Sequence, residues 1–108
     1  MHIEQSSKVT ELRHGALTYV AGLVITRQRP SSAAGVTFVT IEDETGYLNL
    51  VIWERVAKSQ RTILLGATLL GVRGRVQKEG NVVHVVAHKL YDHSTLLDSL
   101  PAQSRDFH

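Results

Sequence analysis

The chain has 108 residues and a net charge of +2, which suits one domain able to bury a core without disulfide bonds or a structural metal. It contains no cysteine, which excludes a disulfide framework and a thiolate metal site and fits the reducing cytoplasm, where we expect it to act. The N-terminal residues lack the apolar core of a signal peptide, and no apolar run approaches the roughly 18 residues that cross a bilayer, so we expect no membrane contact.

The order of the predicted elements follows from the spacing of apolar residues. Alternation with a period of two predicts five strands, at residues 16–27, 36–42, 47–53, 68–77 and 81–90. Helical spacing and helix-end residues predict short helices at residues 54–61 and 94–100, and about one helical turn within a leading segment at residues 4–13. Gly22 inside the first strand indicates a bulge or bend, and Gly46 is expected at positive φ in the turn between the second and third strands. Ser94 is the expected cap of the last helix.

Three strands, a helix and two further strands define the fold class. This is the element order of the OB-fold, an all-β, five-stranded Greek-key barrel with a short helix between the third and fourth strands. A β-sandwich would need about seven strands. We therefore predict an N-terminal leader or linker at residues 1–14, an OB-fold domain at residues 15–92, and a short helix and tail at residues 93–108.

The second and third strands carry the first candidate binding residues. Oligonucleotides usually lie across these two strands of the fold. Alternation turns Phe38 and Thr40 outward on one strand and Asn49 outward on the other. Phe38 could stack on a base or instead cover a barrel end, and Asn49 could hydrogen-bond a base edge. Trp53 ends its strand where the helix begins, and we expect it to pack beneath that helix rather than to face a ligand.

Basic residues provide the second candidate set. Residues 47–91 hold seven Lys and Arg against two acids, so this part of the surface should attract phosphates. Arg27 and Arg29 lie where the loop after the first strand begins, and Arg73, Arg75 and Lys78 lie on or beside the fourth strand. We predict that these five residues contact the phosphate backbone; the alternative is that they aid solubility and protect strand edges.

The sequence shows no arrangement of catalytic or metal-binding residues. His84 and His88 lie four apart on a strand, about 13 Å from each other, so they cannot share one ion. Asp43 and Glu44 have no base or nucleophile arranged around them, and no glycine-rich phosphate loop is present. We expect no catalytic residue, no metal and no other cofactor in this chain.

Several motifs resemble one family over residues 15–108. Residues 21–30, residues 35–46 and residues 82–87 resemble the C-terminal OB domain of bacterial C-family replicative polymerases, most closely the error-prone branch. The terminal Ser104-Arg-Asp-Phe-His108 is similar to the natural C-terminus of the error-prone enzymes. The hairpin pattern alone also resembles the anticodon-binding barrels of class II tRNA synthetases. Those barrels stack a base on the residue at the position of Phe38 and read one from that of Asn49.

The resemblance implies a non-catalytic module of a DNA-directed DNA polymerase that acts in DNA-damage-induced translesion synthesis. The module would bind single-stranded template DNA, while the nucleotidyltransferase site lies elsewhere in the parent. One alternative is a module that docks other translesion or mutagenesis proteins through residues 93–108, although the leucines there could simply close the barrel end. A weaker alternative is a tRNA anticodon-binding domain.

Overall fold

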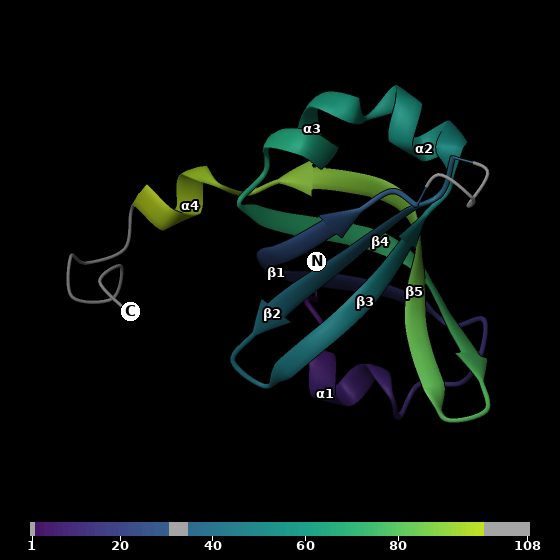
Figure 1. The fold of residues 1–108 in the computed structure, drawn as a ribbon. Coiled ribbons are helices and arrows are strands. Elements are labelled where there is room, and N and C mark those ends of the chain that lie inside the picture. Colours follow the sequence, from purple (N-terminus) through teal and green to yellow (C-terminus); the bar gives the residue numbers. More distant parts are fainter. Residues whose placement is uncertain (1, 31–34, 99–108) are drawn as a thin grey trace.

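Five strands close into one barrel in the computed structural model, which describes residues 2–30 and 35–98. The strands are β1 (Leu17–Gln28), β2 (Thr37–Asp43), β3 (Gly46–Ile52), β4 (Leu69–Glu79) and β5 (Val82–Asp92). They follow one another around the barrel as β1-β2-β3-β5-β4, with β4 paired to β1 and with β3 and β5 parallel (Figure 1). The predicted all-β OB-fold barrel is confirmed.

Short helices cover both ends of the barrel. They are α1 (Ser6–Val9), α2 (Glu54–Ser59), α3 (Arg61–Gly66) and α4 (Thr95–Asp98). In Figure 1, α2 and α3 lie across one end, α1 lies under the other, and α4 points away from the barrel. Within the described residues, no helix is long and apolar enough to span a membrane.

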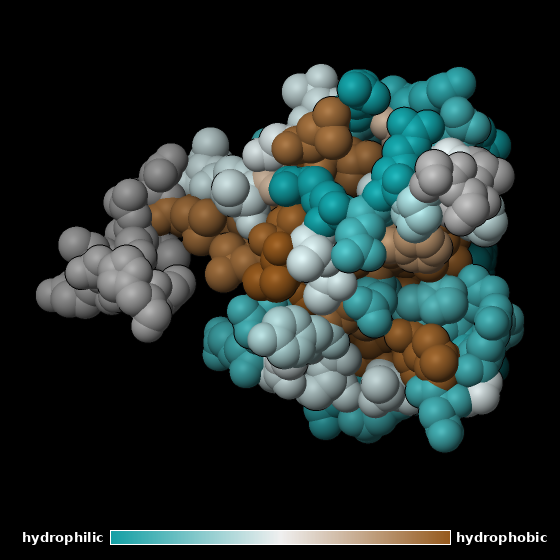
Figure 2. Space-filling view, viewed as in Figure 1, coloured by the Kyte–Doolittle hydropathy of each residue, from teal (hydrophilic) through white to brown (hydrophobic). Residues whose placement is uncertain are grey.

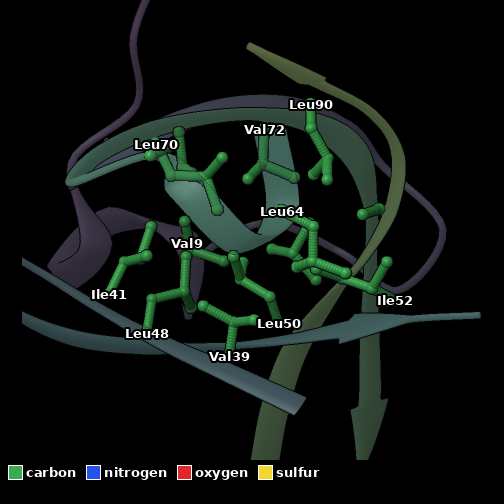
Figure 3. Close-up of a cluster of buried hydrophobic side chains, with 14 of the residues drawn as sticks. Val9, Val39, Ile41, Leu48, Leu50, Ile52, Leu64, Leu70, Val72 and Leu90 are labelled. Carbon is green, nitrogen blue, oxygen red and sulfur yellow. The ribbon is translucent and has the colours of Figure 1, made fainter. Parts of the chain in front are cut away.

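The core forms because inward residues of every strand meet inside the closed sheet. Leu50, Ile52, Val72 and Val85 are each fully buried, and such burial stabilises the fold by about 1.5–3 kcal/mol per side chain. Val9 from α1, itself fully buried, points into the same cluster (Figure 3). The segment before the first strand therefore contributes to the core of the barrel.

The first strand bends so that it can serve two neighbours. Its first half pairs with β4 and its second half with β2, and the register shifts between Val24 and Thr26. The irregularity predicted at Gly22 therefore lies further along the strand, between Val24 and Thr26. Gly22 is required for another reason, because a Cβ there would lie 2.6 Å from the carbonyl oxygen of Glu42 on β2.

The predicted helix after β3 is present as α2, but a second helix, α3, follows it. The two are separated at Gln60, whose φ of −122° and ψ of 34° are not helical. The Gln60 side chain donates to the carbonyl oxygen of Leu90 at 2.9 Å and accepts from its N–H at 2.8 Å. The residue at which α2 and α3 separate is thus also the one whose side chain bonds to the backbone of β5.

Ser94 directly precedes α4, and its side chain also links two strands. Its hydroxyl oxygen accepts the N–H of Thr68 at 2.9 Å and donates to Asp92, which joins the start of β4 to the end of β5. The predicted helix to Leu100, the tail from Pro101 and the terminal motif at residues 104–108 extend beyond residue 98 and lie outside the described residues.

Candidate nucleic-acid interface

The candidate binding residues of β2 and β3 face outward. Phe38 is 41% exposed and pairs with Val51, while Thr40 pairs with Asn49 directly across the two strands. Between Phe38 and Thr40, Val39 is buried in the core. The alternation that turned Phe38, Thr40 and Asn49 to one side is confirmed, and the structure brings these three side chains together.

A hydrogen bond fixes the orientation of the Asn49 amide. The hydroxyl of Thr40 donates to the amide oxygen of Asn49 at 2.9 Å. The amide nitrogen donates to no other residue in the described part of the chain, and Asn49 is exposed. The face therefore presents a hydrogen-bond donor beside the ring of Phe38, which suits an acceptor atom on a stacked base.

Trp53 differs from its predicted position beneath the helix. It is the residue that precedes α2, and 54% of its surface is exposed. It lines a surface hollow together with Arg55, Val86 and His88. The prediction was wrong because the strand alternation of Asn49 and Val51 continues through Trp53 and turns its ring outward. That alternation was the sequence signal that could have predicted the exposure of Trp53.

The two ends of the β2–β3 face have opposite character. Glu42 pairs with Tyr47 near the hairpin tip, so this end is acidic. Beyond Phe38 the face leads to a hollow of about 240 Å³ between the end of β1 and the helices α2 and α3. Its lining includes the basic side chains of Arg29, Lys58 and Arg61 and the acid of Glu54. Figure 2 shows apolar and hydrophilic surface interleaved on this side of the molecule.

Asp43 stabilises the hairpin turn at the acidic end. Its carboxylate accepts hydrogen bonds from the N–H and hydroxyl of Ser6 at 2.7 and 2.8 Å, and from the N–H of Thr45 at 2.8 Å. Burial alone would raise the pKa of the Asp43 carboxyl, but hydrogen bonds from Ser6 and Thr45 outweigh it and lower that pKa to about 2. Asp43 therefore joins α1 to the turn.

Three of the predicted phosphate-binding residues bond to the chain itself. The guanidinium of Arg27 donates to the carbonyl oxygen of Leu64 at 2.6 Å and to that of Ala67, at the end of α3. Arg75 donates to the carbonyl oxygen of Gly15 at 2.8 Å, and the ammonium of Lys78 donates to that of Thr10 at 2.8 Å.

The basic residues of β4 are not adjacent to Phe38. Arg73 and Arg75 are exposed on the outer surface of β4, and β5 separates that strand from β3. Arg29 does lie near Phe38, because Gln28 pairs with Phe38 at the end of β1. The structure thus divides the predicted basic set between two sides of the barrel.

Within residues 2–30 and 35–98, no group of three or more His, Asp or Glu side chains is placed to hold a metal ion.

The fold and the family comparison agree on the class of protein. The family described as "OB-fold nucleic acid binding domain" matches residues 18–92, and the chain belongs to it. Among individual proteins, the chain is similar to error-prone DNA polymerases. It is 55% identical over 97 residues to that of Methylococcus capsulatus and 56% identical over 95 residues to that of Alkalilimnicola ehrlichii. These matches cover 90% and 88% of this chain but 9% of each relative. The chain thus spans about a tenth of the length of these curated relatives, and the resemblance found in the sequence is confirmed.

Solved structures of similar shape support the fold. Asparaginyl-tRNA synthetase from Pyrococcus horikoshii superposes with a TM-score of 0.70 and 24% identity, over 86% of this chain and 22% of the synthetase chain. OBody AM1L10, solved bound to hen egg-white lysozyme, gives a TM-score of 0.66 and 15% identity, over 86% of this chain and 92% of that one. At these identities the likeness shows the barrel and nothing further.

Proposed function

We propose that this chain is the single-stranded DNA-binding module of an error-prone DNA polymerase and holds template DNA across β2 and β3. The observation that carries the proposal is the exposed ring of Phe38 beside the oriented amide of Asn49, on the face where oligonucleotides usually lie in this fold. Similarity to error-prone polymerases favours DNA as the ligand. The barrel at residues 15–92 binds and orients, and the polymerase chemistry belongs to other parts of the parent.

In this proposal, each side chain has a separate role. A base stacks on Phe38, a contact worth roughly 1–3 kcal/mol that tolerates any base because every base has a π-face. The amide nitrogen of Asn49 donates to an acceptor on that base or its neighbour. The basic hollow beyond Phe38 receives the adjoining phosphates through Arg29 and Arg61, while Lys58 in the same lining pairs with Glu54 at 3.4 Å.

The charge of the face gives the strand a preferred route. Glu42 and Glu44 at the hairpin tip would repel phosphates, whereas the opposite end of the face is basic. The strand therefore crosses β2 and β3 near Phe38 and avoids the tip. In the parent enzyme this contact would position damaged template during translesion synthesis, alongside other mutagenesis proteins.

The experiment is a fluorescence anisotropy titration of labelled oligo-dT with the 108-residue chain at two salt concentrations. We expect saturable, micromolar or weaker binding that weakens steeply as salt rises. Phe38→Ala should weaken it by roughly 5- to 150-fold, the equivalent of one lost stacking contact. Tyr47→Ala is the matched control, because Tyr47 is 66% exposed but lies at the acidic end, and it should change affinity less than about twofold.

Two results would count against the proposal. Absence of binding at high micromolar protein and low salt would contradict it. Equal losses of affinity in Phe38→Ala and Tyr47→Ala would show that Phe38 is not a specific stacking site. An RNA oligonucleotide of matching sequence should bind no more tightly than the DNA. A clear preference for RNA would point instead to an anticodon-type ligand.

A further inference from the structure

Three surface hollows meet at one residue on the side of the barrel formed by β3, β5 and β4. One lies between Trp53, Arg55 and Val86, a second beside Arg75 and Val86, and a third beside Arg73 and Tyr19. His88 on β5 is exposed and lines all three. We call this continuous area the His88 surface, and its principal residues are Trp53, Arg55, Arg73, Arg75, Val86 and His88.

The charge of the His88 surface has one sign. Within the described residues, no Asp or Glu lines any of its three hollows, while three arginines do. The acids lie elsewhere: Glu42, Asp43 and Glu44 line a separate hollow beside β1, and Glu54 lines the hollow near Arg29. A surface with cations and no anions suits a ligand with a repeated negative charge, such as a phosphate backbone.

The same surface offers an aromatic face and an apolar floor. Trp53, between β3 and α2, is 54% exposed, so its ring is accessible for stacking. Val86 lies half-buried on β5, between Val51 of β3 and Arg75 of β4. Aromatic rings interleaved with arginines are what proteins use to hold single strands without sequence preference.

The His88 surface continues directly from the β2–β3 face. Phe38 pairs with Val51, Val51 with Val86, and Val86 with Arg75, so one row of paired positions crosses four neighbouring strands. Val51 is only 9% exposed and Val86 is half-buried, so these two form an apolar floor between the exposed Phe38 and Arg75. At about 4.8 Å per strand spacing, Phe38 and Arg75 lie roughly 14 Å apart along this row. In Figure 1, β5 runs beside β3 with β4 behind it, so the row passes around the side of the barrel. OB folds bind about 4–16 nucleotides, and the longer sites need more surface than two strands provide.

We propose that the His88 surface is a second binding segment for single-stranded DNA, which holds the part of the strand that leaves the β2–β3 face. Trp53 stacks on a base, and Arg55 and Arg73 contact phosphates on either side of β5. Arg75 contacts a phosphate through the guanidinium donors that its bond to the carbonyl oxygen of Gly15 leaves unused. The inference rests on the proposed function, since it extends the same strand, but it involves different residues. It makes the strand wrap partly around the barrel instead of crossing one face.

The test compares oligo-dT of about 6 and about 16 nucleotides, because only the longer one can cover both segments. Trp53→Ala and Arg73→Gln should each weaken binding of the longer oligonucleotide by at least about fivefold and leave the shorter one within about twofold. Each variant is compared with the unaltered chain on the same oligonucleotide. The number of positions at which the chain can bind that oligonucleotide therefore does not affect the ratio of affinities. Lys8→Gln, which removes one exposed charge on α1, is the control and should change neither. A circular dichroism melt should show both variants folded.

The outcomes separate the inference from the function on which it rests. If the shorter oligonucleotide binds through Phe38 but the two variants leave the longer one unchanged, the His88 surface is not a binding segment and the proposed function stands. If both lengths weaken equally in Trp53→Ala and Arg73→Gln, the two segments are not separate and the inference is overturned. If neither length binds the unaltered chain, both proposals fall.

Discussion

At the scale of single residues, side-chain direction was predictable and side-chain bonding was not. Alternation along β2 and β3 correctly turned Phe38 and Asn49 outward, because successive residues of a strand point to opposite faces. The bond from Thr40 that orients Asn49, and those that Arg27 donates to α3, join residues from different elements. Their partners depend on the folded barrel, so no local pattern reveals them.

Asn49→Asp tests the donor on the β2–β3 face. The substitution keeps the shape but replaces the amide donor with an anion that repels phosphates and accepts only. We expect oligo-dT affinity to fall roughly tenfold or more in an anisotropy titration, with the melting temperature within a few degrees because Asn49 is exposed. Thr40→Val, which removes only the orienting hydroxyl, should cost less. Unchanged affinity in Asn49→Asp would mean that the amide meets no base.

Arg27→Gln and Arg29→Gln form a matched pair that separates folding from binding. Arg27 bonds to two carbonyl oxygens at the end of α3, so its loss should lower the free energy of unfolding by about 1–2 kcal/mol in a urea titration. Arg29 lines the basic hollow, so its loss should weaken DNA binding and leave stability unchanged. If Arg27→Gln were instead fully stable but deficient in DNA binding, Arg27 would be a phosphate contact, as the sequence predicted.

At the scale of elements, the strands were predicted within a few residues because their period-two pattern is local. The helices between β3 and β4 were only half predicted. The dipole-matched charges of Glu54 and Arg61 marked one helix, whereas the break at Gln60 coincides with bonds to Leu90, 30 residues away. The contribution of α1 to the core could not be predicted either, because it too depends on contacts between distant segments. A helix of one turn has little periodicity, and Val9 is buried only because the barrel end accepts it.

The link between α1 and the β2–β3 turn predicts an acid-sensitive stability. The pKa of Asp43 is about 2 in the folded chain against an ordinary 3.8, so its stabilisation is complete above about pH 3.8 and lost as pH falls through 2. Asp43→Asn should lower the free energy of unfolding at neutral pH by about 1–2 kcal/mol, allowing for solvent screening. The difference from the unaltered chain should vanish near pH 2. Glu44→Gln, at the adjacent exposed acid, should change stability by less than about 0.5 kcal/mol. A difference between Asp43→Asn and the unaltered chain that does not depend on pH would contradict the ionic role of Asp43.

At the scale of the whole molecule, the barrel separates its charges. Acids gather at the β2–β3 tip, while arginines and lysines gather near Phe38 and around His88. The sequence predicted a basic region from the count of charges between residues 47 and 91, but it could not show that Arg73 and Arg75 lie across β5 from the predicted face. Closure of the sheet decides which strands are neighbours, and that closure depends on the parallel pairing of β3 and β5, whose paired residues, such as Asn49 and His84, are far apart in the chain.

The placement of single-stranded DNA on the β2–β3 face is tested most directly by mapping amide chemical shifts during titration of the isotope-labelled chain with oligo-dT. We predict saturable shifts at residues 37–40 and 49–53, with the tip at residues 43–46 nearly unchanged. Shifts confined to the tip or to α4, or no saturable shift at millimolar DNA, would contradict that placement.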